Sequence, residues 1–161
     1  MYAPISFGNA GGNGFTERQE SWSGLLVEAE AALKAGNDLA SREAFDRAMR
    51  FSGDNPQVPI SIAVLILRHN RPELAREYLE PAVARFPNEP RLHRTLGLVL
   101  YRLGHYEASQ VSIRQALSLD NTDALSYVLL GSVLSKLGDR AAAENYLLEA
   151  QRLDPSLTKI R

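Results

Sequence analysis

Apolar residues recur along most of the chain with the three- and four-residue spacing of amphipathic helices. From residue 16 onward, segments of this kind alternate with short polar turns, and strand signals are absent. One β-branched cluster, residues 60–66, is compatible with a buried strand by composition alone. It lies inside a segment of helical length, so the pattern favours an all-α protein.

The first fifteen residues have no helical periodicity. They include the glycine-rich run at 8–14, and glycine maximises backbone entropy, so we expect residues 1–15 to form a flexible tail and residues 16–161 to form the folded domain. The Lys-Ser/Thr pair that completes a phosphate-binding loop does not follow the glycines. Thr16 and Gln19 have the spacing of a capping box, which predicts Thr16 as the first N-cap.

A spacing of 34 residues connects four turn positions: Gly36, Asn70, Gly104 and Gly138. Each follows a predicted helix, where a left-handed residue closes the turn. Glycine adopts this conformation without steric cost, and asparagine is the next best residue. The spacing therefore predicts four repeats of a helix pair, at residues 22–55, 56–89, 90–123 and 124–157.

Three further columns keep the same register. A small residue in each first helix faces a small residue in each second helix, and a large apolar residue follows four positions later. This arrangement lets two helices approach closely while the large side chains fill the flanking space. The columns are Ala29, Ala63, Gly97 and Gly131; Ser41, Ala75, Ser109 and Ala143; and Phe45, Leu79, Ile113 and Leu147.

These residues resemble the tetratricopeptide repeat family. The fourth window matches its pattern best, with Tyr127, Leu130-Gly131, Leu134, Ala143, Leu147 and Pro155 in the expected order. The third window has His93, Leu96-Gly97 and Leu100, whereas the first two are looser. The resemblance implies a right-handed α-solenoid of four antiparallel helix pairs. A generic helical-hairpin bundle would not keep a constant phase of 34 residues.

Two residues depart from the pattern. Pro81 falls late in a second helix, where it removes one backbone hydrogen bond and predicts a kink or an early helix end. Glu28 stands where leucine is expected. Since a buried, unpaired carboxylate is costly, Glu28 must either reach solvent or shift its helix.

Composition narrows the function classes. The net charge of −1 gives no sign of a nucleic-acid or membrane partner, and no stretch approaches the length of a membrane span. The chain has no cysteine, which excludes disulfides and thiolate metal sites. With no secretory signal pattern at the N-terminus, we expect a cytoplasmic protein, or a periplasmic one if a signal has been removed.

The sequence contains no recognisable catalytic chemistry. Its histidines, His69, His93 and His105, lack the i, i+3 or i, i+4 spacing that brings two ligands to one metal. No nucleophile motif or cofactor fingerprint accompanies them. We therefore expect no catalytic residues, no metal and no cofactor, with His93 at an aromatic core position and the other two beside turns.

The family resemblance implies that the first helices of the repeats line a concave groove. In this register the groove has an apolar floor and one basic column: Lys34, Arg68, Arg102 and Lys136. Arg91 and Arg94 extend it to a positive edge, although these cations can equally serve only to solubilise the surface. The predicted binding residues are Leu26, Glu30, Leu33, Lys34, Ile60, Val64, Leu67, Arg68, Arg91, Arg94, Leu98, Tyr101, Arg102, Val128, Ser132 and Lys136. Flanking groove positions are Val27, Gln57, Ser61, Thr95, Leu125, Leu129 and Ser135.

Such a groove predicts a non-catalytic protein-interaction module, adaptor-like or chaperone-like, that binds an apolar or amphipathic peptide segment. The Lys and Asn places of chaperone-docking repeats hold Leu26, Ile60, Val64 and Leu98, which disfavours a carboxylate clamp. On this interpretation Leu67→Glu should abolish binding and leave the helices intact. The alternatives are a self-assembly scaffold and a docking fragment of a larger enzyme. The outward face of the last repeat predicts a homo-oligomer that associates through a terminal repeat.

Overall fold

The computed structural model describes residues 21–51 and 53–159 of the chain. The expected tail at residues 1–15 and Thr16 lie outside this part. The described residues form α-helices and one 3₁₀ helix, without a strand, and each predicted repeat window contains one helix pair. The elements are α1 (Trp22–Lys34), α2 (Asp38–Phe51), α3 (Gln57–Arg68), α4 (Pro72–Arg85), α5 (Pro90–Arg102), α6 (Tyr106–Leu119), α7 (Ala124–Leu137), α8 (Arg140–Leu153) and η1 (Pro155–Lys159).

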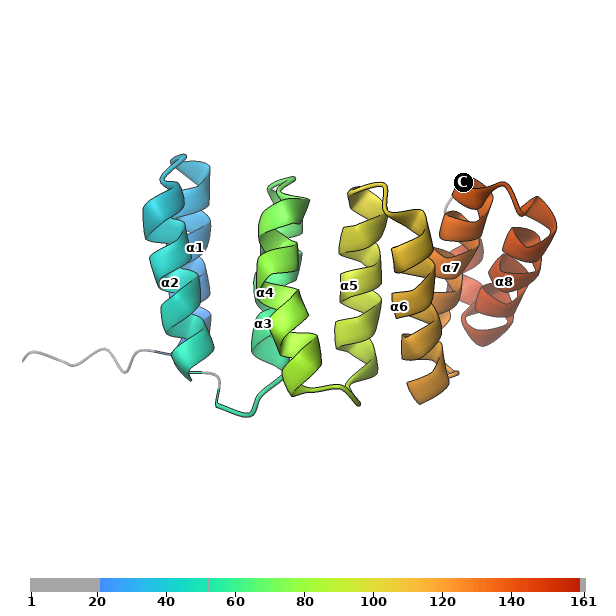
Figure 1. Ribbon diagram of the computed structural model, residues 1–161, viewed down its shortest axis with the longest axis horizontal. Helices are drawn as coiled ribbons and strands as arrows, with labels where there is room; N and C mark the ends of the chain where they lie inside the picture. The colour runs from blue at the N-terminus through green and yellow to red at the C-terminus, as the bar shows by residue number, and fades with distance from the viewer. Residues whose placement is uncertain (1–20, 52, 160–161) are drawn as a thin grey trace, which may run out of the picture.

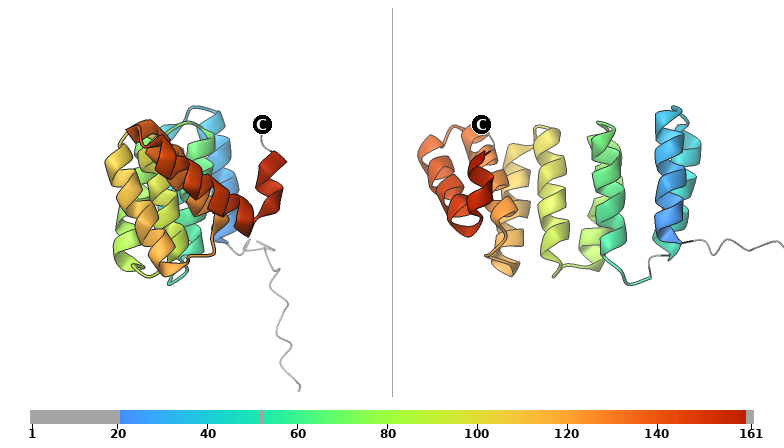
Figure 2. Two further views of the ribbon diagram at one scale, coloured as in Figure 1. Left: turned by 90° about the vertical axis from the view of Figure 1, so that its right-hand side faces the viewer. Right: turned by 180° about the vertical axis from the view of Figure 1, so that it is seen from behind.

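The helix pairs stand side by side in chain order, so that the fold is an elongated α-solenoid (Figure 1). The first helices α1 and α3 lie behind α2 and α4 in Figure 1 and face the viewer in the right-hand view of Figure 2. In the first two pairs the first and second helices therefore lie on opposite sides of the row. None of the described helices is both long and apolar enough to cross a membrane.

The turns inside the pairs confirm the prediction from the 34-residue spacing. Gly36, Asn70, Gly104 and Gly138 all have positive φ, with values of 71°, 56°, 78° and 90°. Asn70 is the only non-glycine residue with positive φ among the described residues. The left-handed residue lets the chain reverse immediately after each first helix, which fixes the antiparallel pairing.

The predicted small columns are buried between the two helices of each pair. Ala29 and Ala63 are fully inaccessible, as are Ser41 and Ser109. The approach is tightest in the third pair, where a Cβ placed on Gly97 would lie 2.5 Å from Cγ1 of Ile113. Ser109 uses this proximity to donate a hydrogen bond of 2.6 Å from its hydroxyl to the Gly97 carbonyl. Both helices of the pair are thereby held in one register.

The junction between the first two pairs combines an aromatic contact with polar bonds. The rings of Phe45 and Tyr78 pack edge-on with centroids 5.5 Å apart, and the Tyr78 hydroxyl donates to Asp46 at 3.0 Å. Arg42 forms a bidentate pair with Glu77 at 2.6 and 3.3 Å, which lowers the pKa of Glu77. Because both charged groups are half-exposed, most of the junction's strength lies in the packing of the partly buried Tyr78 ring on the buried Phe45 ring.

The two departures from the repeat pattern are accommodated by nearby residues. Glu28 reaches solvent and pairs with Arg47 at 3.2 Å, so the helix does not shift to hide it. Pro81 does not end α4, which continues to Arg85 and buries Leu79 and Ala82. The early helix end predicted at Pro81 is therefore wrong, since burial on both sides of the proline keeps the last turn in place.

The start of α1 is capped by a serine side chain. Its N-cap is Ser21, whose side chain accepts a hydrogen bond of 3.1 Å from the backbone N–H of Gly24. The predicted cap Thr16 lies outside the described residues. Ser21 satisfies one of the free N–H donors of the first helical turn directly before the first apolar stripe, and serine is among the preferred capping residues.

Candidate functional site

The first helices α1, α3, α5 and α7 bring their outward stripes to one face of the solenoid. On α5 this stripe is Arg91, Thr95, Leu98 and Arg102, at positions i, i+4, i+7 and i+11. Such spacing keeps the residues on one side of a helix with 3.6 residues per turn. The opposite side of α5 buries Leu92, Val99 and Leu100, which leaves the stripe to face away from the core.

The first hollow on this face lies where α1, α3 and the start of α5 meet. Its centre is apolar, and its border carries Glu30, Arg68 and Arg91. Gln57 donates to the hydroxyl of Ser61 at 3.0 Å within its wall. The residues that line it are Leu26, Val27, Glu30, Gln57, Ile60, Ser61, Val64, Leu65, Arg68 and Arg91.

The second hollow lies where α3, α5 and α7 meet, and it is the more apolar of the two. It has a volume of about 440 Å³, in the usual range for ligand pockets. The residues that line it are Val64, Arg94, Thr95, Leu98, Tyr101, Arg102, Leu125, Val128, Leu129 and Ser132. Val64 belongs to both hollows, so they adjoin at this side chain. We call the two hollows together the groove.

Most of the predicted binding residues therefore meet in the groove. The exceptions are Leu33, Lys34, Leu67 and Lys136, which line neither hollow. Leu33 and Leu67 are only 7% and 9% exposed and belong to the hydrophobic core. Placing them on the groove floor is wrong, because their position on the helix directs them to the second helices. Leu65, which the sequence analysis missed, lines the first hollow from a largely buried position.

The positive edge is partly neutralised by Glu30. Its carboxylate lies 3.2 Å from Nζ of Lys34, 3.7 Å from Nη2 of Arg68 and 3.9 Å from Nε2 of His69. The hydrogen bond from Lys34 is the main reason why the pKa of Glu30 is lowered from its usual value. Two cations of the predicted basic column therefore already share one acid at the first hollow.

Arg94 is also paired. Its guanidinium lies 2.6 Å from Asp123, and both side chains are mostly buried, at 22% and 19% exposure. Asp123 in turn accepts a hydrogen bond from the Ser126 hydroxyl at 2.5 Å. This small network joins α5 to the start of α7, so Arg94 supports the wall of the second hollow.

The structure places His93 and the acidic side chains as follows. His93 is buried, and its Nε2 donates to the Pro87 carbonyl at 2.7 Å, a structural role at the expected core position. Within this part of the chain, His, Asp and Glu side chains form no group of three or more able to hold a metal ion.

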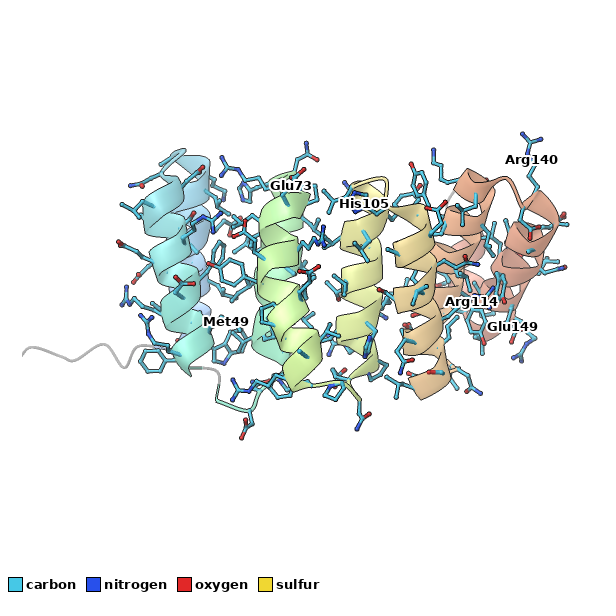
Figure 3. All side chains as sticks on the ribbon, viewed as in Figure 1. Met49, Glu73, His105, Arg114, Arg140 and Glu149 are labelled. Carbon is cyan, nitrogen blue, oxygen red and sulfur yellow. The ribbon has the colours of Figure 1, made fainter. Side chains whose placement is uncertain are left out.

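A third hollow lies on the opposite side of the row, near the turn between α5 and α6. Glu73 and His105, both labelled at the upper edge of the row in Figure 3, line it together with Arg76, Glu77, Glu80 and Leu103. Arg76 and Glu80 form an ion pair of 2.6 Å across one helical turn. This surface is a charged and largely exposed face of α4, and it lacks the apolar centre of the groove.

Two family models described as tetratricopeptide repeat match the chain, one over residues 62–124 and one over residues 124–157. Human Tetratricopeptide repeat protein 7B is 33% identical over 104 residues, which are 61% of this chain and 12% of that protein. Protein FlbA from Caulobacter vibrioides is 26% identical over 139 residues, which are 86% of this chain and 23% of that protein. The chain thus spans a quarter or less of either relative.

Solved structures show the same fold. MamA from Desulfovibrio magneticus RS-1 superposes with a TM-score of 0.66 at 20% identity, covering 87% of this chain and 78% of that one. YrrB superposes with a TM-score of 0.66 at 16% identity, covering 88% and 73%, and is described as a TPR protein with an unusual peptide-binding site. At these identities the superpositions establish the architecture alone.

Proposed function

Because the chain belongs to the tetratricopeptide repeat family, we propose that it is a non-catalytic protein-interaction module whose groove binds an apolar or amphipathic polypeptide segment. The observation that carries this proposal is the apolar centre of the groove. Val64 is 45% exposed at the point where the two hollows adjoin, and Leu98 and Val128 continue the apolar surface. Apolar surface gathered in a hollow marks a binding site more often than scattered exposed residues do.

The charged border supports a peptide rather than a purely apolar ligand. Arg68, Arg91 and Arg102 stand at the edges of the hollows, where they remain in contact with water. An interface with an apolar centre and a polar rim is the usual anatomy of protein recognition. The peptide-binding site named for YrrB supports the same class of ligand through the shared architecture.

The proposal is tested by Val64→Glu. This change puts a carboxylate at the centre of the groove, and we expect binding of captured peptides to weaken at least tenfold, which corresponds to about 1.4 kcal/mol. Peptides are first selected on the wild-type chain from a random-peptide phage library, and the affinities of synthetic copies are then measured by fluorescence anisotropy.

Val111→Glu is the matched control, because Val111 is 70% exposed on α6 and lines neither hollow. It introduces the same residue change on the second-helix side. We expect it to keep wild-type affinity. If the library yields no peptides, or if the selected peptides bind both variants equally well, the groove is not the binding site.

The exposed leucines of α8 favour a second proposal, association between copies of the chain through the last repeat. Leu147 is 39% exposed, whereas its counterparts Phe45, Leu79 and Ile113 are fully buried, and the adjacent Leu148 is 57% exposed. We expect light scattering to give a mass above that of one chain and Leu148→Glu to reduce it to one chain. A monomeric mass for the unmodified chain at high concentration would exclude this association.

A further inference from the structure

The groove contains cations that no acid of the described chain neutralises. Glu30 lies beside Lys34 and Arg68, and Asp123 pairs with Arg94. The side chains of Arg91 and Arg102 form no ion pair with any described residue, although both line the groove and both are exposed. Their counter-charge must come from solvent ions or from a ligand.

Arg91 and Arg102 occupy equivalent positions on one helix face. They are separated by eleven residues of α5, close to three full turns, which places them on the same side and about 16 Å apart along the axis. Arg91 lines the first hollow and Arg102 lines the second. The two arginines therefore bracket the part of the groove in which Val64 connects the hollows.

The surface between these two arginines offers mainly apolar contacts to a ligand. Leu98 lies between them on the same stripe, and Thr95 is only 5% exposed. The Thr95 hydroxyl already donates to the Arg91 carbonyl at 2.7 Å, so it offers little to a ligand. An apolar side chain placed here would contact Leu98 and Val64.

We propose that the groove selects an acidic amphipathic segment of a partner protein, in which two carboxylates bracket an apolar anchor. The carboxylates would pair with Arg91 and Arg102, about 16 Å apart, and the anchor would pack on Val64 and Leu98. Arginine suits this role because its planar guanidinium binds a carboxylate through two parallel hydrogen bonds. This inference rests on the proposed function and adds the charge pattern of the ligand.

The chain's own N-terminal segment fits the groove less well. Residues 1–15, the predicted tail, include apolar residues such as Ile5 and Phe7 but no charged side chain, and the acids Glu17 and Glu20 follow them. That segment supplies apolar anchors, but its acids lie on one side of them only, so they do not bracket an anchor between two arginines. Charge complementarity therefore favours a separate acidic partner over the tail of this chain or of a second copy.

The test uses charge reversal in the whole chain. A random-peptide phage library is selected in parallel on the wild type and on Arg91→Glu, Arg102→Glu and the control Arg140→Glu. Arg140 is exposed at the start of α8, in the last helix pair of the row and outside the groove (Figure 3). We expect wild-type and Arg140→Glu pools to carry Asp or Glu on both sides of an apolar cluster.

Peptides selected on Arg91→Glu or on Arg102→Glu should lack the acid on one side of the apolar cluster only, and should carry Lys or Arg in its place. A synthetic copy of the wild-type consensus should bind each reversal about tenfold more weakly and the control unchanged, with a smaller difference at high salt. Circular dichroism of each variant confirms the fold.

Selected peptides that are apolar but not acidic, or that bind the reversals as well as the wild type, would overturn the inference and leave the groove proposal standing. The inference would also be overturned if a synthetic peptide of residues 1–16 bound the wild-type chain as tightly as the consensus peptide does. Failure of the proposed function looks different, because no peptides would then distinguish the wild type from Val64→Glu.

Discussion

Replacing Phe45 with alanine is expected to lower the free energy of unfolding of the first repeats by about 3–5 kcal/mol, the usual cost of truncating a buried aromatic side chain. Phe45 is completely inaccessible and packs on Tyr78 of the next repeat with ring centroids 5.5 Å apart. Its loss therefore removes packing inside the first pair and also across the junction to the second.

Phe51→Ala is the matched control for this prediction. Phe51 is on the same helix, α2, but is 54% exposed, so its loss should change stability by about 0.5 kcal/mol or less. Urea unfolding followed by far-UV circular dichroism measures both variants. In a solenoid each repeat contacts only its neighbours, so hydrogen exchange in Phe45→Ala should accelerate first in α1 and α2. Equal losses of stability in the two variants would contradict the conclusion that Phe45 packs both within its own pair and against the next one.

The fold could be predicted from the sequence because its constraints are local and repeated. A positive φ at the turn requires glycine or asparagine, and this requirement recurs at Gly36, Asn70, Gly104 and Gly138. The small columns are similar, since Gly97 faces Ile113 at a distance that excludes a side chain. Each constraint affects one position in every repeat, so the spacing of 34 residues reveals it.

The errors arise where neighbouring elements decide the outcome. Leu147 occupies the same column as Phe45 and Ile113, yet it is 39% exposed, because no further pair packs on α8 in the described structure. Pro81 lies in a helix whose last turn is held by the burial of Ala82. The exposure of Leu147 agrees with the open outward face expected for the last repeat, whereas the continued helix at Pro81 does not follow from the repeat pattern, which describes an average repeat rather than a particular neighbour.

The groove was predicted in its general position but not in its charge. The column of cations is visible in the sequence, and so is the acid Glu30 one turn before Lys34, whereas other ion pairs of the positive edge join different helices. Glu30 of α1 lies near Arg68 of α3, and Asp123 at the start of α7 pairs with Arg94 of α5. Only the structure identifies Arg91 and Arg102 as the cations left without an acid.

The sequence also misplaced Leu67, and the structure reverses the outcome expected for Leu67→Glu. Leu67 is 9% exposed and lies in the core, so a carboxyl group there would be buried without a partner. Burial of this kind raises the pKa of a carboxyl by several units, which corresponds to a loss of at least about 4 kcal/mol at neutral pH. We therefore expect Leu67→Glu to unfold α3 and its neighbours, and not merely to abolish binding.

The pH dependence distinguishes this mechanism from a loss of packing alone. The introduced carboxyl has a higher pKa in the folded state than its unfolded value near about 4.3, so the folded state binds the proton more tightly. The stability lost relative to the wild type should therefore be smallest at or below pH ~4 and should grow as the pH rises. Val64→Glu, one turn earlier on α3, introduces the same group at a position that is 45% exposed, so it should show little of this dependence. Urea unfolding of both variants across this pH range measures the difference. If Leu67→Glu were as stable as Val64→Glu at neutral pH, the result would indicate that Leu67 faces the groove and not the core.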